Sequence, residues 1–113
     1  MILVISEKES AALTLHMSIM RKSFRNLIKA RYKARKDDLN KSYDYILQIA
    51  KDALESKNEA NEAHLNIIDL ELLCEFLNSY TSKLAKFDLK DVDFEQLEVM
   101  EGLHLRCREL MAA

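Results

Sequence analysis

Apolar side chains recur at helical spacing along most of this chain. The first stripe of apolar residues, separated by steps of four and three, consists of Leu13, Met17, Met20, Phe24 and Leu27. This spacing places them on one face of an α-helix. Ser6 can cap that helix, and Glu9 three residues later completes a capping box. The stripe ends near Ile28, yet the next residues favour helix, so we expect one long helix over residues 7–36, roughly 45 Å in length.

A second apolar stripe predicts a second helix. Its members are Leu39, Tyr43, Ile46, Ala50 and Ala53. Asp37 and Asp38 can cap this helix, or the first helix can run on into it. Asn58 is a plausible end of the helix. Residues 57–63 contain few large apolar side chains and indicate a connection or an exposed turn of helix.

The two remaining helices have similar starts. Asp69 and Asp93 each follow an apolar residue and precede a leucine four positions later, which is typical of an N-cap with a hydrophobic staple. Residues 87–92 form a short connection, so these helices should pair as an antiparallel hairpin. We therefore expect an all-α protein: a small four-helix bundle with a long basic first helix and a C-terminal antiparallel helical hairpin, in one helical domain over residues 1–113. The apolar segment 1–5 is open to a strand, a tail or a dimer contact.

Composition removes several classes of function. The chain has 113 residues, no Pro and one Gly, which excludes glycine-rich phosphate loops and turn-rich β-sandwiches. Two cysteines are too few for a disulfide scaffold and fit a reducing compartment. No apolar run is long enough to cross a membrane. A cytoplasmic protein without membrane contact is the expectation.

Charge is strongly segregated along the sequence. Residues 1–41 carry ten basic and four acidic side chains, whereas the rest carries seven basic and 15 acidic ones. The eight basic residues of segment 21–36, which contains no acidic residue, are Arg21, Lys22, Arg25, Lys29, Arg31, Lys33, Arg35 and Lys36. The lysines among them fall mostly on the solvent side of the predicted helix, and Arg31 and Arg35 extend positive charge toward its apolar side.

This basic segment is the candidate partner-binding site, and its use is open. It can meet an acidic protein surface. It can contact the phosphates of DNA or RNA. It can pair with the acidic half of the same chain or of a second copy, or it can be a solvated helix face without a partner.

Residues with metal-binding or catalytic chemistry are few. Glu101 and His104 are spaced like half of a ferritin-type metal site, and His104 and Cys107 like two zinc ligands, but no second pair accompanies them. Cys74 has no local motif of a nucleophile. We therefore expect no catalytic residues, no metal and no cofactor. Gly102 in the fourth helix either permits a close helix approach or is incidental.

The sequence thus predicts a non-enzymatic protein–protein interaction module, such as a small adaptor, regulator or inhibitor that docks on a larger protein. The long helix and the segregated charge favour a homodimer in which the basic end of one copy meets the acidic half of the other. The alternative is a nucleic-acid-binding regulator that uses residues 21–36.

Overall fold

A computed structural model describes residues 1–84 and 94–113. Within these residues the chain is mostly helical, with four α-helices, one 3-10 turn and two short strands. In chain order they are β1 (Ile2–Ser6), α1 (Glu7–Arg31), η1 (Lys33–Arg35), α2 (Lys36–Ser56), β2 (Ala60–His64), α3 (Ile67–Leu84) and α4 (Phe94–Ala112). The predicted all-α class broadly fits.

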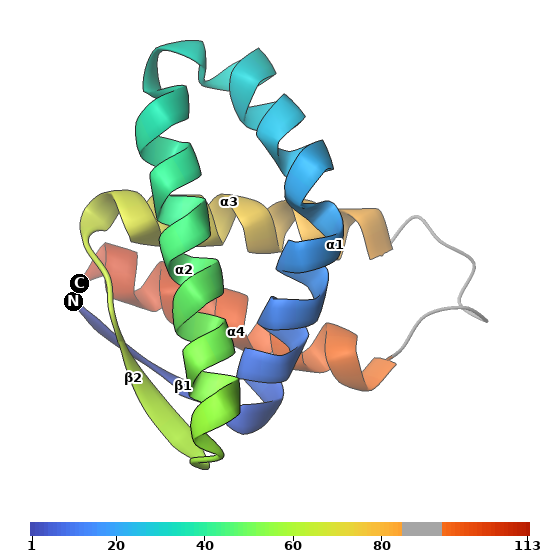
Figure 1. The fold of residues 1–113 in the computed structure, drawn as a ribbon, viewed down its shortest axis with the longest axis vertical. Helices are drawn as coiled ribbons and strands as arrows, with labels where there is room; N and C mark the ends of the chain where they lie inside the picture. Colours follow the sequence, from blue (N-terminus) through green and yellow to red (C-terminus); the bar gives the residue numbers. More distant parts are fainter. Residues whose placement is uncertain (85–93) are drawn as a thin grey trace.

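The helices form two antiparallel pairs (Figure 1). The α1–α2 hairpin crosses the α3–α4 pair, and the two strands lie along one side of the molecule, near both chain ends. The expected pairing of the last two helices is confirmed. The finer expectation of a four-helix bundle is not confirmed, because the pairs cross and a two-stranded sheet accompanies them.

The first helix begins as predicted and ends earlier than predicted. The Ser6 hydroxyl accepts a hydrogen bond from the Glu9 amide at 3.1 Å, and the Glu9 carboxylate accepts one from the Ser6 amide at 2.8 Å. α1 stops at Arg31, because Tyr32 leaves helical geometry with φ −128° and ψ 45°. The expected helix over residues 7–36 is therefore wrong at its end. Burial of the apolar side of α2 against α1 requires the chain to turn here, and it outweighs the helix propensity of residues 32–36.

The two strands were not predicted as a sheet. β1 pairs antiparallel with β2, with Ile2 opposite His64 and Ser6 opposite Ala60. Leu3 and Ile5 are buried against the helices, while Ile2 and Val4 face outward. Of the alternatives for segment 1–5, the structure shows a strand. Its partner strand β2 includes residues 60–63, which were expected to be part of a connection. A two-stranded sheet is marginal alone, so the helices beneath it supply the stability.

The prediction that Asp69 is the N-cap of the third helix is wrong. Asn66 precedes the helix, and its side chain accepts a hydrogen bond from the Asp69 amide at 2.8 Å. The Asp69 carboxylate accepts one from the Asn66 amide at 3.0 Å. Asp69 is therefore the third residue of the helix and not its cap, because the helix extends one turn further toward the N-terminus. The predicted cap Asp93 and the connection 87–92 lie outside the described residues.

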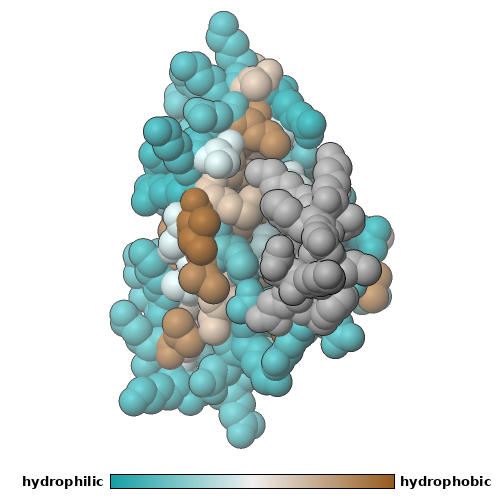
Figure 2. Space-filling model, turned by 90° about the vertical axis from the view of Figure 1, so that its right-hand side faces the viewer, coloured by the Kyte–Doolittle hydropathy of each residue, from teal (hydrophilic) through white to brown (hydrophobic). Residues whose placement is uncertain are grey.

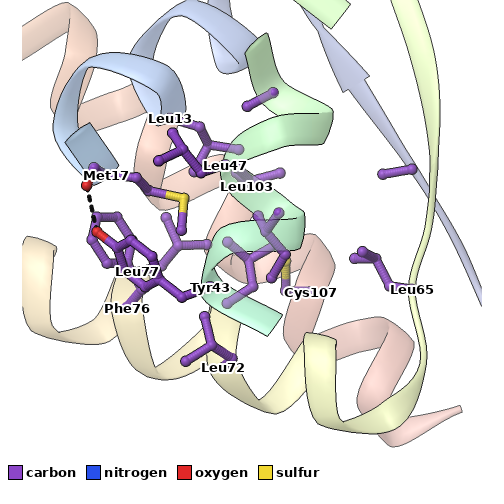
Figure 3. Packing of buried hydrophobic residues seen from close by; sticks show 14 of the residues in the cluster. Leu13, Met17, Tyr43, Leu47, Leu65, Leu72, Phe76, Leu77, Leu103 and Cys107 are labelled. Atoms are coloured by element: carbon purple, nitrogen blue, oxygen red, sulfur yellow. Dashed lines mark hydrogen bonds between the residues drawn. The ribbon is translucent and has the colours of Figure 1, made fainter. Parts of the chain in front are cut away.

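One buried apolar cluster joins all four helices (Figure 3). Its centre holds three aromatic rings, with the Phe24 centroid 5.6 Å from that of Tyr43 and 5.4 Å from that of Phe76. The buried Tyr43 hydroxyl donates a hydrogen bond to the Met17 carbonyl, the dashed contact in Figure 3. This contact satisfies the polar atom of an otherwise apolar core and fixes α2 against α1.

Candidate functional site

The eight basic residues of segment 21–36 run up the second half of α1 and over the turn into α2. We call residues 28–39 the hairpin tip; it extends beyond the α3–α4 pair at the top of Figure 1. The same end of the molecule is mostly hydrophilic in Figure 2. Five of these basic residues thus lie in the hairpin tip, namely Lys29, Arg31, Lys33, Arg35 and Lys36, while the other three lie before it on α1.

Two of the arginines stabilise the hairpin itself. Arg21 and Arg25 on α1 both reach the carboxylate of Asp44 on α2, at 2.7 and 3.4 Å. All three side chains are nearly half exposed. Exposed ion pairs of this kind contribute at most about 1 kcal/mol each, so these contacts link the two helices but add little to their stability.

The other two arginines connect the hairpin tip to α3. Arg35 contacts the Glu71 carboxylate at 2.6 Å, and Arg31 approaches the Glu75 carboxylate at 3.6 Å. These are the two arginines that the helical spacing directed toward the apolar side. All four arginines of the basic segment therefore pair with acidic side chains of the same chain.

The lysines behave differently. Lys22, Lys29, Lys33 and Lys36, which we call the lysine face, are all exposed. In the described part of the chain, none of them makes a hydrogen bond or an ion pair. Arginine suits fixed, directional pairing, whereas lysine carries a mobile and strongly hydrated charge. The lysine face is thus the part of the basic segment whose charge is not used within the fold.

A cavity of about 290 Å³ lies beneath the hairpin tip. Its apolar floor is formed by buried side chains of three helices, namely Phe24, Ile28, Leu39 and Leu72. Such a concave apolar surface with a few polar groups is the usual form of a ligand site.

Charged and polar groups form the rim of this cavity. The Arg35–Glu71 ion pair stands on one part of the rim, with Tyr32 and Glu75 beside it. Partial burial and the neighbouring Glu75 carboxylate raise the pKa of Tyr32 above its ordinary value of 10.0, so its phenol stays protonated even in moderately alkaline solution. Cys74 and Met111 complete the wall, with their sulfur atoms 3.4 Å apart.

Sequence reasoning did not find this cavity. Its residues come from four helices, and only the positions of Arg31 and Arg35 on the apolar side of the first helix pointed toward it. Glu71, Leu72 and Glu75 gave no separate signal, because their role depends on how α3 packs under the hairpin.

Apart from Cys74 in the cavity wall, the residues considered for metal binding or catalysis lie elsewhere. His104 is half-buried, and burial followed by the nearby Arg108 lowers its pKa. Among the described residues, no group of three or more His, Cys, Asp or Glu side chains is placed to hold a metal ion. His16 contacts Gln96 and lies 3.1 Å from the Tyr80 hydroxyl.

The two thiols face each other between α3 and α4. Burial raises the pKa of Cys74, and it raises the pKa of Cys107 to about 12. Both groups are therefore thiols and not thiolates at neutral pH, which makes them poor nucleophiles.

In the described residues, no helix has the length and apolar character needed to cross a membrane. No protein-family model, curated protein or solved structure matches this chain.

Proposed function

We propose that this protein is a non-enzymatic interaction module, a small adaptor, regulator or inhibitor that docks on a larger protein through its lysine face. One observation carries the proposal: the arginines of the basic segment are paired within the fold, while Lys22, Lys29, Lys33 and Lys36 are not. A projecting surface of unpaired positive charge favours an acidic partner and accelerates the encounter with it.

The position of Lys29, Lys33 and Lys36, the members of the lysine face that lie in the hairpin tip, supports this role. The hairpin tip extends past the rest of the molecule (Figure 1), so a partner can reach it without displacing the core. The buried side chains of Phe24, Ile28 and Leu39 hold the backbone beneath the lysines in place, and the exposed ion pairs to Asp44, Glu71 and Glu75 add little to this. A preorganised surface loses less conformational freedom on binding.

The second candidate is a nucleic-acid-binding regulator, and the same unpaired lysines support it. Phosphate contacts by lysine need no fixed geometry and provide affinity without sequence specificity. The formal net charge of −2 acts against it, since the remaining surface repels a polyanion. A nucleic acid is negative along its whole length and meets more of this repulsion than a local acidic patch on a protein, so an acidic protein surface fits better.

A charge-reversal experiment separates these possibilities. The test variant is Lys29→Glu with Lys33→Glu, and the matched control is Lys51→Glu with Lys57→Glu, two exposed lysines on the second half of α2 and just after its end. We expect wild type and control to retain the same protein from a cell lysate, and the test variant to lose it with unchanged thermal stability. Equal retention by all three proteins would contradict a role of the lysine face.

The nucleic-acid candidate has its own measurement. Fluorescein-labelled duplex and single-stranded DNA and RNA are titrated at low and at near-physiological salt. We would conclude that the protein binds nucleic acid if its association constant falls by about 0.9 log units per phosphate contact for each log unit of salt. Binding should also disappear in the test variant. Absence of binding at low salt would remove this candidate.

A further inference from the structure

We propose that three sulfur atoms between α3 and α4, those of Cys74, Cys107 and Met111, form a binding site for one Cu(I) ion. The site extends from the wall of the cavity beneath the hairpin tip to the buried core behind it. This inference goes beyond the proposed function, because it requires neither the lysine face nor a protein partner.

The three sulfur atoms are close together in the fold. The Cys74 Sγ lies 3.4 Å from the Met111 Sδ, and the Cys74 thiol also interacts with the thiol of Cys107. Two sulfur atoms that share a metal ion, each at about 2.3 Å from it, are at most about 4.6 Å apart. The Cys74–Met111 separation is within this limit, so the helices do not have to move for these two atoms to share an ion.

The types of ligand select the metal. Thiolate and thioether sulfur atoms are soft donors, which Cu(I) prefers, whereas zinc is bound by thiolate, imidazole and carboxylate groups. Over residues 1–84 and 94–113, no three His, Cys, Asp or Glu side chains are grouped so that they could hold a metal ion. Zinc therefore lacks a third ligand of its usual kind at the two thiols, while Cu(I) finds one in the Met111 thioether.

The ion can reach these atoms from the surface. Cys74 and Met111 line both the cavity beneath the hairpin tip and a shallow groove between α3 and α4, which His104 also borders. Met111 stands in the last turn of α4 and is 36% exposed. Cys107 is completely buried, with its sulfur atom inside the core cluster (Figure 3). The site thus has solvent on one side and the core on the other.

Binding of Cu(I) displaces two protons. The ion accepts lone pairs from two thiolates and one thioether, and both thiol protons pass to solvent, so the occupied site carries one negative charge. Arg108 influences the Cys74 thiol more than Glu75 does, and it makes no ion pair in the described part of the chain. Arg106 is already paired with Glu9. Arg108 therefore supplies the positive charge that balances the occupied site.

The test titrates the reduced protein with Cu(I) in the absence of oxygen, in competition with the chromophoric chelator bicinchoninate. We expect one Cu(I) per chain, a thiolate-to-copper charge-transfer band in the ultraviolet, and no displacement of the copper by an equal concentration of Zn(II). Failure to take Cu(I) from the chelator, or displacement of the copper by Zn(II), would overturn the proposal.

X-ray absorption at the copper edge identifies the donor atoms. We expect three sulfur donors in the wild-type protein and two in Met111→Leu. A nitrogen donor in the wild-type protein would assign the third position to a histidine such as His104 and overturn the role of Met111.

Two methionine variants test the thioether. Met111→Leu removes its sulfur atom and retains a side chain of similar size, and Met20→Leu makes the same change at a partly buried methionine on α1. We expect Met111→Leu to weaken Cu(I) binding by about tenfold or more, since loss of a group that only supports a metal ligand costs about 10–100-fold. Met20→Leu should leave the affinity unchanged. Equal affinities of the two variants would overturn the assignment of Met111.

A cysteine variant tests the thiolates. Cys74 is half-buried, so Cys74→Ala should fold, as checked by thermal unfolding, and should lose both Cu(I) binding and the charge-transfer band. Cys107→Ala should have the same effect, and Cys74→Ala decides the question if the variant of the buried cysteine does not fold. Undiminished Cu(I) binding by folded Cys74→Ala would show that the ion binds elsewhere.

Discussion

Gly102 stands inside α4 without a packing reason. A Cβ atom built at this position meets nothing within 4 Å, so the glycine does not serve a close helix approach. Glycine in a helix interior is less stable than alanine by about 1 kcal/mol. We expect Gly102→Ala to raise the free energy of unfolding by about that amount, measured by urea denaturation. A matched change at the exposed neighbour, Glu101→Ala, should stay within about 0.5 kcal/mol; loss of stability in Gly102→Ala would indicate a contact made outside this chain.

Cys107 makes the stability of the protein depend on alkaline pH. Burial raises its pKa in the folded state to about 12, whereas in the unfolded chain the thiol ionises near its ordinary value of 9.0. Between these values the unfolded state loses a proton that the folded state keeps, so stability falls as the pH rises above 9.0. The slope attributable to one such group approaches about 1.4 kcal/mol per pH unit.

Cys107→Ala tests this dependence. The variant loses stability at all pH values because it leaves a cavity, but its unfolding free energy should fall less steeply above pH 9 than that of wild type. Cys74→Ala serves as the comparison, since Cys74 is only half-buried and burial raises its pKa as well. Parallel pH profiles for wild type and Cys107→Ala would contradict the shifted pKa.

The N-terminus of α3 allows a test of which residue caps the helix, the predicted Asp69 or the observed Asn66. If Asp69 were the N-cap, Asn66→Ala would change little. In the structure Asn66 and Asp69 exchange reciprocal hydrogen bonds of 2.8 and 3.0 Å. We therefore expect Asn66→Ala to destabilise the protein by about 1 kcal/mol, measured by thermal unfolding. The mid-helix control Asn78→Ala, whose side chain makes no such cap, should have no destabilising effect.

The elements also show what the sequence could and could not predict. The Ser6–Glu9 capping box and the apolar stripes are local patterns, and the structure confirms both. The β1–β2 ladder joins residues 54 to 62 positions apart, from Ser6 with Ala60 to Ile2 with His64. The sequence of β2, Ala-Asn-Glu-Ala-His, has little strand propensity of its own. Its conformation comes from pairing with β1, which no local pattern records.

The candidate site has the same limit. The basic segment could be recognised from the sequence alone, because its residues are neighbours along the chain. The division between paired arginines and unpaired lysines could not, because it depends on Asp44, Glu71 and Glu75 arriving from other helices. The cavity beneath the tip depends on the same packing and was missed for the same reason.

Positive and negative charge remain separated on the surface of the protein, and this separation can drive two copies to associate. The arginines find acidic partners within the chain, but the lysine face stays positive while the rest of the surface carries an acidic excess. The proposed homodimer places the lysine face of one copy against the acidic surface of the other. Attraction of this kind weakens as the Debye length falls from about 30 Å at 0.01 M salt to about 3 Å at 1 M.

Light scattering after size-exclusion chromatography tests this dimer. We expect twice the monomer mass at low salt and the monomer mass at high salt, with unchanged helicity by circular dichroism. Lys29→Glu with Lys33→Glu should give a monomer at both salt concentrations, because it makes the facing surfaces repel each other. Lys51→Glu with Lys57→Glu carries the same change in total charge and should still dimerise at low salt. A monomeric wild type at every concentration and salt would end the dimer proposal, and it would leave the lysine face free for a different protein.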